Sequence, residues 1–291
     1  MVVIRLIIIL SMTTYCGSLR AAEPIEHVVL LAFDGLSVAG LHKARTPHLD
    51  VLRDTGVLLT RSRGVMPTKS APNWASILTG VYPDEHGIHS NQWWWFRFKR
   101  TLGQPTLFTA LKNKQPESKA VALYEWKQFG RLFQADDLSQ SRWIKKSAET
   151  IQNLTEVWHA GVPKFTVLHL VSADMAGHEH NWMSDAYIQG VEYVDAQVGA
   201  ITSLLAEKGA LKNTLIVVAS DHGGVGDGHG SDSDTELYTP VIFNGPGVRS
   251  GVRLRGMTQN IDITVTLFHA LGLESGMPLK GVPIKWIWQK D

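Results

Sequence analysis

The sequence predicts an α/β fold in which a mainly parallel central sheet is covered by helices on both faces. Three short, almost continuously apolar runs support this prediction, because strands buried on both faces of a sheet have this character. They span residues 27–33, 165–171 and 215–220, and each ends at or shortly before an aspartate. Amphipathic stretches lie between them, and strands that alternate with helices are typical of a parallel sheet.

The other elements follow from the same patterns. Residues 120–124 and 240–243 are further apolar runs that we expect to be strands. Residues 184–207 carry apolar side chains at helical spacing, with Ser184 as a suitable N-cap, and a second helix is expected over 261–271. The 291 residues are 44% hydrophobic and 19% charged, without an internal repeat or long linker. We therefore expect one domain over residues 23–291.

The first residues have a different character from the rest. Arg5 precedes the apolar run 6–10, and small residues lead to Ala21 and Ala22. This arrangement is typical of a secretory signal peptide, and the run is far short of the roughly 20 apolar residues that span a bilayer. The alternative is a retained amphipathic or membrane-anchoring helix. We expect residues 1–22 to be a cleaved signal peptide and the mature protein to be periplasmic or secreted, without a stable membrane anchor.

Composition limits the chemistry and the partners. The single cysteine, Cys16, lies in the expected signal peptide, so the mature protein would contain no disulfide and no thiolate ligand. Any metal ion would be held by histidine and carboxylate groups. The formal net charge is +1 and no basic stripe stands out, so we expect no binding of nucleic-acid polymers. A nucleotide substrate would have to be recognised by a local site.

Candidate metal ligands follow the three apolar runs. In a parallel sheet the carboxyl ends of the strands meet at one edge, where functional groups gather. Each residue alone has an ordinary explanation, as a turn residue, a helix cap or a solvated loop histidine. Their joint occurrence predicts a site, because carboxylate oxygen and imidazole nitrogen are both good zinc ligands. The candidates are Asp34, Asp174, His178, Asp221, His222 and His229.

The segment 66–91 carries a more specific pattern. A hydroxyl residue, Ser70, is followed by Pro-Asn, Thr-Gly, Tyr-Pro and His-Gly-Ile, and the pattern ends at Asn91. With the Asp174–His178 and Asp221–His222 motifs, this order resembles the type I phosphodiesterase/nucleotide pyrophosphatase branch of the alkaline phosphatase superfamily. The resemblance spans most of the expected mature chain and implies an alkaline phosphatase-like fold.

The resemblance also implies a reaction. It places Ser70 at the nucleophile and implies a phosphodiesterase or nucleotide pyrophosphatase that acts on a small phosphorylated substrate through a phosphoseryl intermediate. Asn91, with the N–H of Ala71 as a further candidate, would donate hydrogen bonds to the phosphate oxygens. Two divalent ions are implied, and zinc is the usual ion of the family. One would be held by Asp34, Ser70, Asp221 and His222, the other by Asp174, His178 and His229.

Departures from the family pattern leave alternatives open. The usual nucleophile is threonine, and Thr68 is an alternative to Ser70. Trp74 stands where the branch often has histidine. His229 follows His222 by only seven residues, where the family usually has a long insertion, so the substrate-selecting region is expected to be reduced. A phosphomonoesterase on the same scaffold and a non-catalytic binding protein of the same fold are the alternative functions.

Four side chains are candidates for contact with the substrate. Trp93 and Trp94 directly follow the Asn91 region and would form an aromatic wall beside the leaving group, although packing against a helix explains them equally well. Arg97 would contact an anionic group, with a solvated basic turn as the alternative. Tyr124 ends an expected strand and would line the pocket.

Overall fold

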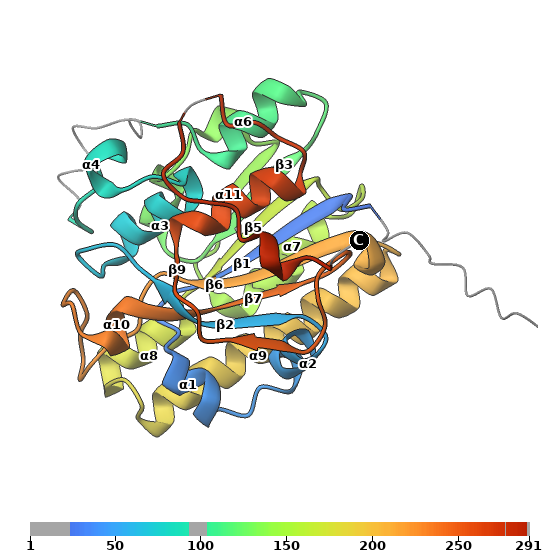
Figure 1. Ribbon diagram of the computed structural model, residues 1–291. Coiled ribbons are helices and arrows are strands. Elements are labelled where there is room, and N and C mark those ends of the chain that lie inside the picture. The colour runs from blue at the N-terminus through green and yellow to red at the C-terminus, as the bar shows by residue number, and fades with distance from the viewer. Residues whose placement is uncertain (1–23, 93–103, 277, 290–291) are drawn as a thin grey trace, which may run out of the picture.

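The computed structural model describes residues 24–92, 104–276 and 278–289. Within these residues a nine-stranded sheet crosses the molecule, with helices on both faces (Figure 1). The strands are β1 (His27–Phe33), β2 (Val57–Arg63), β3 (Ala120–Tyr124), β4 (Gln140–Trp143), β5 (Phe165–Leu170), β6 (Thr214–Ser220), β7 (Tyr238–Asn244), β8 (Val252–Leu254) and β9 (Thr258–Gln259). Their order is β4-β3-β5-β1-β6-β7-β2-β8, and β9 pairs with β2. Neighbours are parallel except that β7 is antiparallel to both β6 and β2.

Helices pack against each face of this sheet. The α-helices are α1 (Val38–Lys43), α2 (Pro47–Asp54), α3 (Ser70–Thr79), α4 (Pro83–His86), α6 (Leu107–Lys114), α7 (Thr150–Val157), α8 (Ser172–His180), α9 (Asp185–Glu207), α10 (Asp234–Leu237) and α11 (Ile261–Ala270). The 3-10 helices are η1 (Lys127–Arg131), η2 (Ala135–Asp137), η3 (Ser147–Glu149), η4 (Leu211–Asn213) and η5 (Lys285–Ile287). Helices α3, α6 and α11 share a hydrophobic cluster on one face, and α1, α2, α7 and α9 share a second cluster on the other.

The central strands show why the apolar runs are continuous. Side chains alternate between the two faces of a strand. In β1, Val28, Leu30 and Ala32 belong to one cluster, while Val29 and its alternating neighbours belong to the other. Because both faces are covered, every position is apolar, and the residues of β1 from Val28 on are almost fully buried.

The predicted elements are confirmed with small shifts at their ends. The three apolar runs form β1, β5 and β6, the residues at 120–124 and 240–243 lie in β3 and β7, and the two expected helices are α9 and α11. Ser184 caps α9 by accepting a hydrogen bond from the N–H of Tyr187. The α/β class with a mainly parallel sheet is also confirmed.

Strand β2 is absent from the sequence-based assignment. Only its first three residues are continuously apolar, and Arg61, in its polar second half, stacks over the ring of Tyr238 at 4.2 Å. The antiparallel direction of β7 relative to β6 and β2 was also not predicted.

Cleavage of residues 1–22 stays a prediction, because these residues lie outside the described ones. In the described part of the chain, no helix combines the length and apolar character needed to cross a membrane.

Candidate metal centre

Three aspartates meet at the carboxyl edge of the sheet, as the sequence predicts. Asp34 directly follows β1 and Asp221 directly follows β6, while Asp174 lies in the first turn of α8, just after β5. Strand β1 pairs with β5 on one side and β6 on the other, so the three strand ends are neighbours. Gly35 permits this approach: its φ is +71°, and a Cβ there would lie 2.9 Å from the Cα of Asp174.

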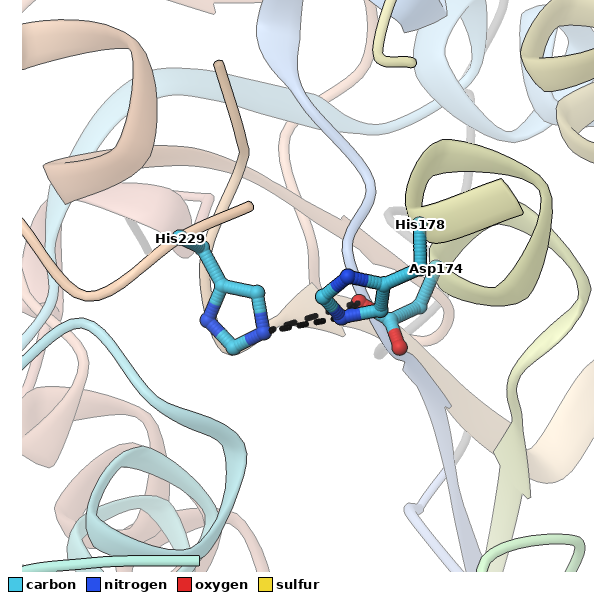
Figure 2. A group of neighbouring side chains, drawn as sticks. All are labelled: Asp174, His178 and His229. Carbon is cyan, nitrogen blue, oxygen red and sulfur yellow. Dashed lines mark hydrogen bonds and ion pairs between the residues drawn. The ribbon is translucent and has the colours of Figure 1, made fainter. Parts of the chain in front are cut away.

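Asp174, His178 and His229 form the first group of candidate ligands (Figure 2). The Nε2 atom of His178 lies 3.6 Å from Asp174 Oδ1 and 3.2 Å from His229 Nε2. His229 Nε2 lies 4.0 Å from the same aspartate oxygen. Two imidazole nitrogens on one tetrahedral zinc ion are about 3.3 Å apart, given Zn–N bonds of roughly 2.0–2.1 Å. The spacing of the two histidines therefore suits a shared ion.

Backbone carbonyls orient the imidazole rings. His178 donates its Nδ1–H to the carbonyl of Asp227 at 2.7 Å, and His229 donates its Nδ1–H to the carbonyl of Thr68 at 2.7 Å. His222 bonds in the same way, at 2.9 Å, to the carbonyl of the residue that follows it. A neutral imidazole that donates from Nδ1 has an unprotonated Nε2, which is the atom that binds a metal. All three Nε2 atoms face the carboxylates.

A second group contains Asp34, Asp174 and His222. His222 Nε2 lies 3.4 Å from Asp34 Oδ1 and 3.1 Å from Asp221 Oδ2. Asp174 thus belongs to both groups, and its carboxylate lies within reach of either ion position. The family resemblance implied it as a ligand of one ion only.

Ser70 begins α3, and its hydroxyl faces this second group. Its Oγ lies 3.2 Å from His222 Nε2, 3.4 Å from Asp34 Oδ1 and 3.4 Å from Asn91 Nδ2. Asn91 Oδ1 accepts the N–H of Ala71 at 2.8 Å, which fixes the amide so that its NH₂ group points towards Ser70. The Ala71 N–H is therefore used to orient Asn91. The positive end of the α3 dipole lies at the same place and favours negative charge there.

Thr68, the alternative nucleophile, points to other partners. Its fully buried hydroxyl lies 2.6 Å from the carbonyl of Ser231 and 2.9 Å from the carboxylate of Glu236. It also accepts the N–H of Gly230 at 3.1 Å. These bonds tie Thr68 to the loop that carries His229, whereas the hydroxyl of Ser70 faces the candidate ligands.

Two side chains orient Asp34 in a way that was not expected from the sequence. His169 Nε2 lies 3.0 Å from Asp34 Oδ2, and Trp74 Nε1–H donates to the same oxygen at 3.4 Å. Both side chains are fully buried, and His169 packs on the ring of Phe129 at a centroid distance of 4.3 Å. With Oδ2 engaged, Oδ1 is the oxygen that faces Ser70. For His169, the available signal was a histidine inside the largely apolar run 165–171.

Trp182 forms a wall behind the first group and was also missed. Its Nε1–H donates to the carbonyl of Gly35 at 3.0 Å, and its ring lies 5.1 Å from that of His178 and 6.0 Å from that of His229. A Cβ on Gly224 would lie 2.2 Å from the Trp182 ring. The second glycine after His222 is therefore explained by close packing against this indole.

The carboxyl groups of the centre are buried close together, an arrangement that a bound cation would stabilise. Burial raises the pKa of Asp174 and Asp221 well above the usual value, and the nearby Asp34 carboxylate adds to this. For Asp34, burial also acts to raise the pKa, but the hydrogen bond and charge of His169, together with the neighbouring histidines, outweigh it and leave the pKa below its usual range. Burial lowers the pKa of His222 to about 3, so this ring is neutral at pH 7.

Two carboxylate oxygens provide the test of whether a metal ion fits. Asp174 Oδ1 and Asp221 Oδ2 are buried, yet neither has a hydrogen-bond partner. A buried carboxylate oxygen without a partner is costly, and coordination to a divalent ion would satisfy it. Neutral histidines and unpartnered carboxylate oxygens therefore fit a zinc-type centre.

The predicted substrate contacts have different outcomes. Trp93, Trp94 and Arg97 lie outside the described residues. Tyr124 ends β3, and its ring packs near Phe129 at a centroid distance of 6.0 Å, while its hydroxyl lies 3.3 Å from Ser141 Oγ. Packing accounts for this position, and a role of Tyr124 in lining the pocket stays a prediction.

The architecture defines an α/β protein with an alkaline phosphatase-like fold and a candidate metal centre of carboxylate and imidazole groups. The family model described as type I phosphodiesterase/nucleotide pyrophosphatase matches residues 28–227, and the chain belongs to this family. The resemblance noted in the sequence is thereby confirmed.

Curated relatives and solved structures agree with this assignment. The chain is 25% identical over 226 residues to ectonucleotide pyrophosphatase/phosphodiesterase family member 3 of Mus musculus, over 67% of this chain and 24% of the relative. It is 25% identical over 230 residues to bis(5'-adenosyl)-triphosphatase ENPP4 of Bos taurus, over 73% of this chain and 50% of the relative. The chain thus spans between about a quarter and a half of these relatives.

A likeness in structure extends over more of the chain. Murine ectonucleotide pyrophosphatase/phosphodiesterase 5, solved as an inactive variant in complex with AMP, superposes with a TM-score of 0.74. The sequence identity is 15%, and the match covers 91% of this chain and 100% of that chain. At this identity the likeness shows the shared fold.

Proposed function

We propose that this protein hydrolyses phosphodiester or phosphoanhydride bonds of a small, nucleotide-like substrate, with Ser70 as the nucleophile. The observation that carries the proposal is the position of the Ser70 hydroxyl, within 3.4 Å of Asp34, His222 and Asn91 at the N-terminus of α3. Membership of the family and the names of the relatives, which include a bis(5'-adenosyl)-triphosphatase, support the substrate class.

The ligand sets are part of the proposal. Asp34, Ser70, Asp221 and His222 would hold one divalent ion, and Asp174, His178 and His229 would hold the other, with zinc as the expected metal. When bound, the ions supply positive charge that favours the serine alkoxide, stabilises the leaving oxygen and acidifies a water molecule. Asp174 lies within reach of both positions and would hold the two sets at a fixed separation.

The chain's own groups perform the remaining steps. The Oγ atom of Ser70 loses its proton to solvent water and forms a bond to phosphorus, while the bond from phosphorus to the leaving oxygen breaks and its electron pair stays on that oxygen. With a diester substrate the product of this step is a phosphoseryl ester that still carries one substituent. The Asn91 amide donates to a non-bridging oxygen, and the α3 dipole favours the negative charge. Water then attacks phosphorus and loses a proton to solvent, the bond from phosphorus to Oγ breaks, and Oγ of Ser70 takes up a proton again.

A comparison of two substrates and two variants tests the proposal. We expect the protein to hydrolyse bis-p-nitrophenyl phosphate faster than p-nitrophenyl phosphate, and Ser70→Ala to lower kcat by at least about 10³-fold while it keeps the fold. Acid quenching of the wild type should trap phosphate ester on Ser70. Ser203→Ala, an exposed serine on α9, is the matched control and should behave as wild type.

Three distinct results would count against the proposal. Full activity in Ser70→Ala would remove the nucleophile from the mechanism. A clear preference for the monoester would favour the alternative, a phosphomonoesterase on the same scaffold. Binding of the substrate without turnover in the zinc-loaded wild type would favour a non-catalytic protein.

The cellular location is proposed from two observations. The relatives are named as ectonucleotide enzymes, and residues 1–22 have the pattern of a signal peptide. We therefore infer that the protein works outside the cytoplasm, in the periplasm or after secretion. N-terminal sequencing of the secreted protein would locate the cleavage expected after residue 21 or 22, and an intact N-terminus on secreted protein would contradict it.

A further inference from the structure

Glu236, in α10, is a buried carboxylate that the sequence analysis did not single out. Only 4% of the residue's surface is exposed to solvent. The Oε2 atom accepts the N–H groups of Gly230 at 2.6 Å and Ser231 at 2.7 Å, and lies 2.9 Å from the hydroxyl of Thr68. The Oε1 atom accepts the hydroxyls of Ser231 at 2.5 Å and Ser233 at 3.1 Å. The partners of Glu236 thus lie at Thr68 and along residues 230–233.

These partners are all neutral N–H and O–H groups. No ion pair joins Glu236 to a lysine or arginine among residues 24–92, 104–276 and 278–289. A buried carboxylate without a cation is tolerated only where hydrogen bonds replace its hydration. Such bonds also act to lower the pKa of Glu236 to about 2 against the opposing effect of burial, so it is ionised at pH 7. This full set of donors indicates that Glu236 organises the chain around it.

The segment that Glu236 holds has little rigidity of its own. Between residues 223 and 230 every position except Val225, Asp227 and His229 is glycine. Glycine restricts the backbone least, so an ordered conformation of such a segment requires contacts from outside it. The Gly230 N–H that Glu236 accepts belongs to the peptide directly after His229.

Thr68 connects the carboxylate to the histidine from a second side. Its hydroxyl bonds to Glu236, and its carbonyl accepts the Nδ1–H of His229 at 2.7 Å. Glu236 therefore fixes both the backbone that carries His229 and the acceptor that orients its ring.

We propose that Glu236 is a positioning residue that holds His229 in the first ligand group and thereby sets the metal affinity of that group. This proposal rests on the proposed function, because it takes His229 to be a metal ligand. A purely structural role for Glu236 would lower the stability of the protein without a selective effect on one ion. The two roles are separated by measuring metal binding and unfolding independently.

A thermodynamic cycle on the whole protein provides the test. Zinc affinity is measured by competition with a chromophoric chelator for the wild type, Glu236→Ala, His229→Ala and the double variant. We expect Glu236→Ala to weaken one of two zinc sites by about 10–100-fold and to leave the other unchanged. In the His229→Ala background it should have no further effect on zinc binding. Thermal unfolding of the metal-free proteins reports on stability separately.

Two further variants keep the test informative. Glu236→Gln keeps one carbonyl oxygen for the two N–H groups, so it should fold and show a smaller loss of zinc affinity if Glu236→Ala proves unstable. Glu192→Ala is the matched control, because Glu192 on α9 accepts the backbone N–H of Arg45, remote in sequence from the loop. Its zinc affinity should equal that of the wild type.

The outcomes distinguish this inference from the function on which it rests. If His229→Ala retains two zinc sites of unchanged affinity, the proposed ligand set is wrong. If His229→Ala weakens a site and neither Glu236 variant does, the positioning role alone is overturned. A further loss of affinity when Glu236→Ala is added to His229→Ala would also overturn it, because Glu236 would then act by another route.

Discussion

Replacement of Asp221 by asparagine is expected to stabilise the metal-free protein while it destroys metal binding. The buried Oδ2 atom of Asp221 has no hydrogen-bond partner and lies 3.1 Å from the unprotonated Nε2 of His222. An asparagine NH₂ group at this place would donate to His222 Nε2, and the carbonyl oxygen would keep the bond from the Gly35 N–H at 3.2 Å. The change replaces a buried carboxylate oxygen without a hydrogen-bond partner by an amide group that donates a hydrogen bond.

The size and pH dependence of the effect follow from this geometry. Satisfying one buried polar group is worth about 1–3 kcal/mol, or roughly 3–10 °C in Tm for a domain of this size. Burial raises the folded-state pKa of Asp221. The raised pKa therefore contributes to the free energy of unfolding of the metal-free protein below the unfolded-state pKa of about 3.8. This contribution is lost as the pH rises through the folded-state pKa of Asp221. The advantage of Asp221→Asn should therefore be larger at pH 8 than at pH 5.

Thermal unfolding with chelator and with excess zinc measures both sides of the prediction. Zinc should raise the Tm of the wild type strongly and that of Asp221→Asn weakly, because binding to the folded state stabilises by mass action. Asp136→Asn, in the exposed turn η2, is the matched control and should leave both values unchanged. A metal-free Asp221→Asn protein with the same or lower Tm than the wild type would refute the reasoning.

Three other substitutions test the surroundings of the centre. His169→Phe removes a donor to Asp34 and should weaken zinc binding by about 10–100-fold in a chelator competition; unchanged affinity would show that His169 does not orient this ligand. Thr68→Val should lower the free energy of unfolding by about 1–3 kcal/mol in denaturant titrations yet reduce kcat far less than Ser70→Ala, and a comparable loss of kcat would reopen Thr68 as nucleophile. Gly224→Ala would place a Cβ 2.2 Å from the Trp182 ring and should lower the Tm; an unchanged Tm would show that the loop adjusts at no cost.

The parts of the fold that depend on local pattern could be predicted from the amino-acid sequence. Runs such as 27–33 are apolar at every position because both faces of the strand are covered, and this is visible without a structure. Strand β2 was not predicted, because its C-terminal half is polar. Its place in the sheet depends on pairing with β7, about 180 residues away in sequence. Pairing over such a distance leaves no periodicity to detect.

The same division applies to the centre. The sequence predicted that three parallel strands end near aspartates and that these side chains gather, because strand ends meet at one edge. The family resemblance linked Ser70 with Asn91. Three features became visible in the folded protein alone: Asp174 belongs to both ligand groups, His169 orients Asp34, and Glu236 contacts the loop of His229. The physical reason is that side chains such as these act through long-range contacts in a closely packed interior, and their partners leave no local signal in the chain.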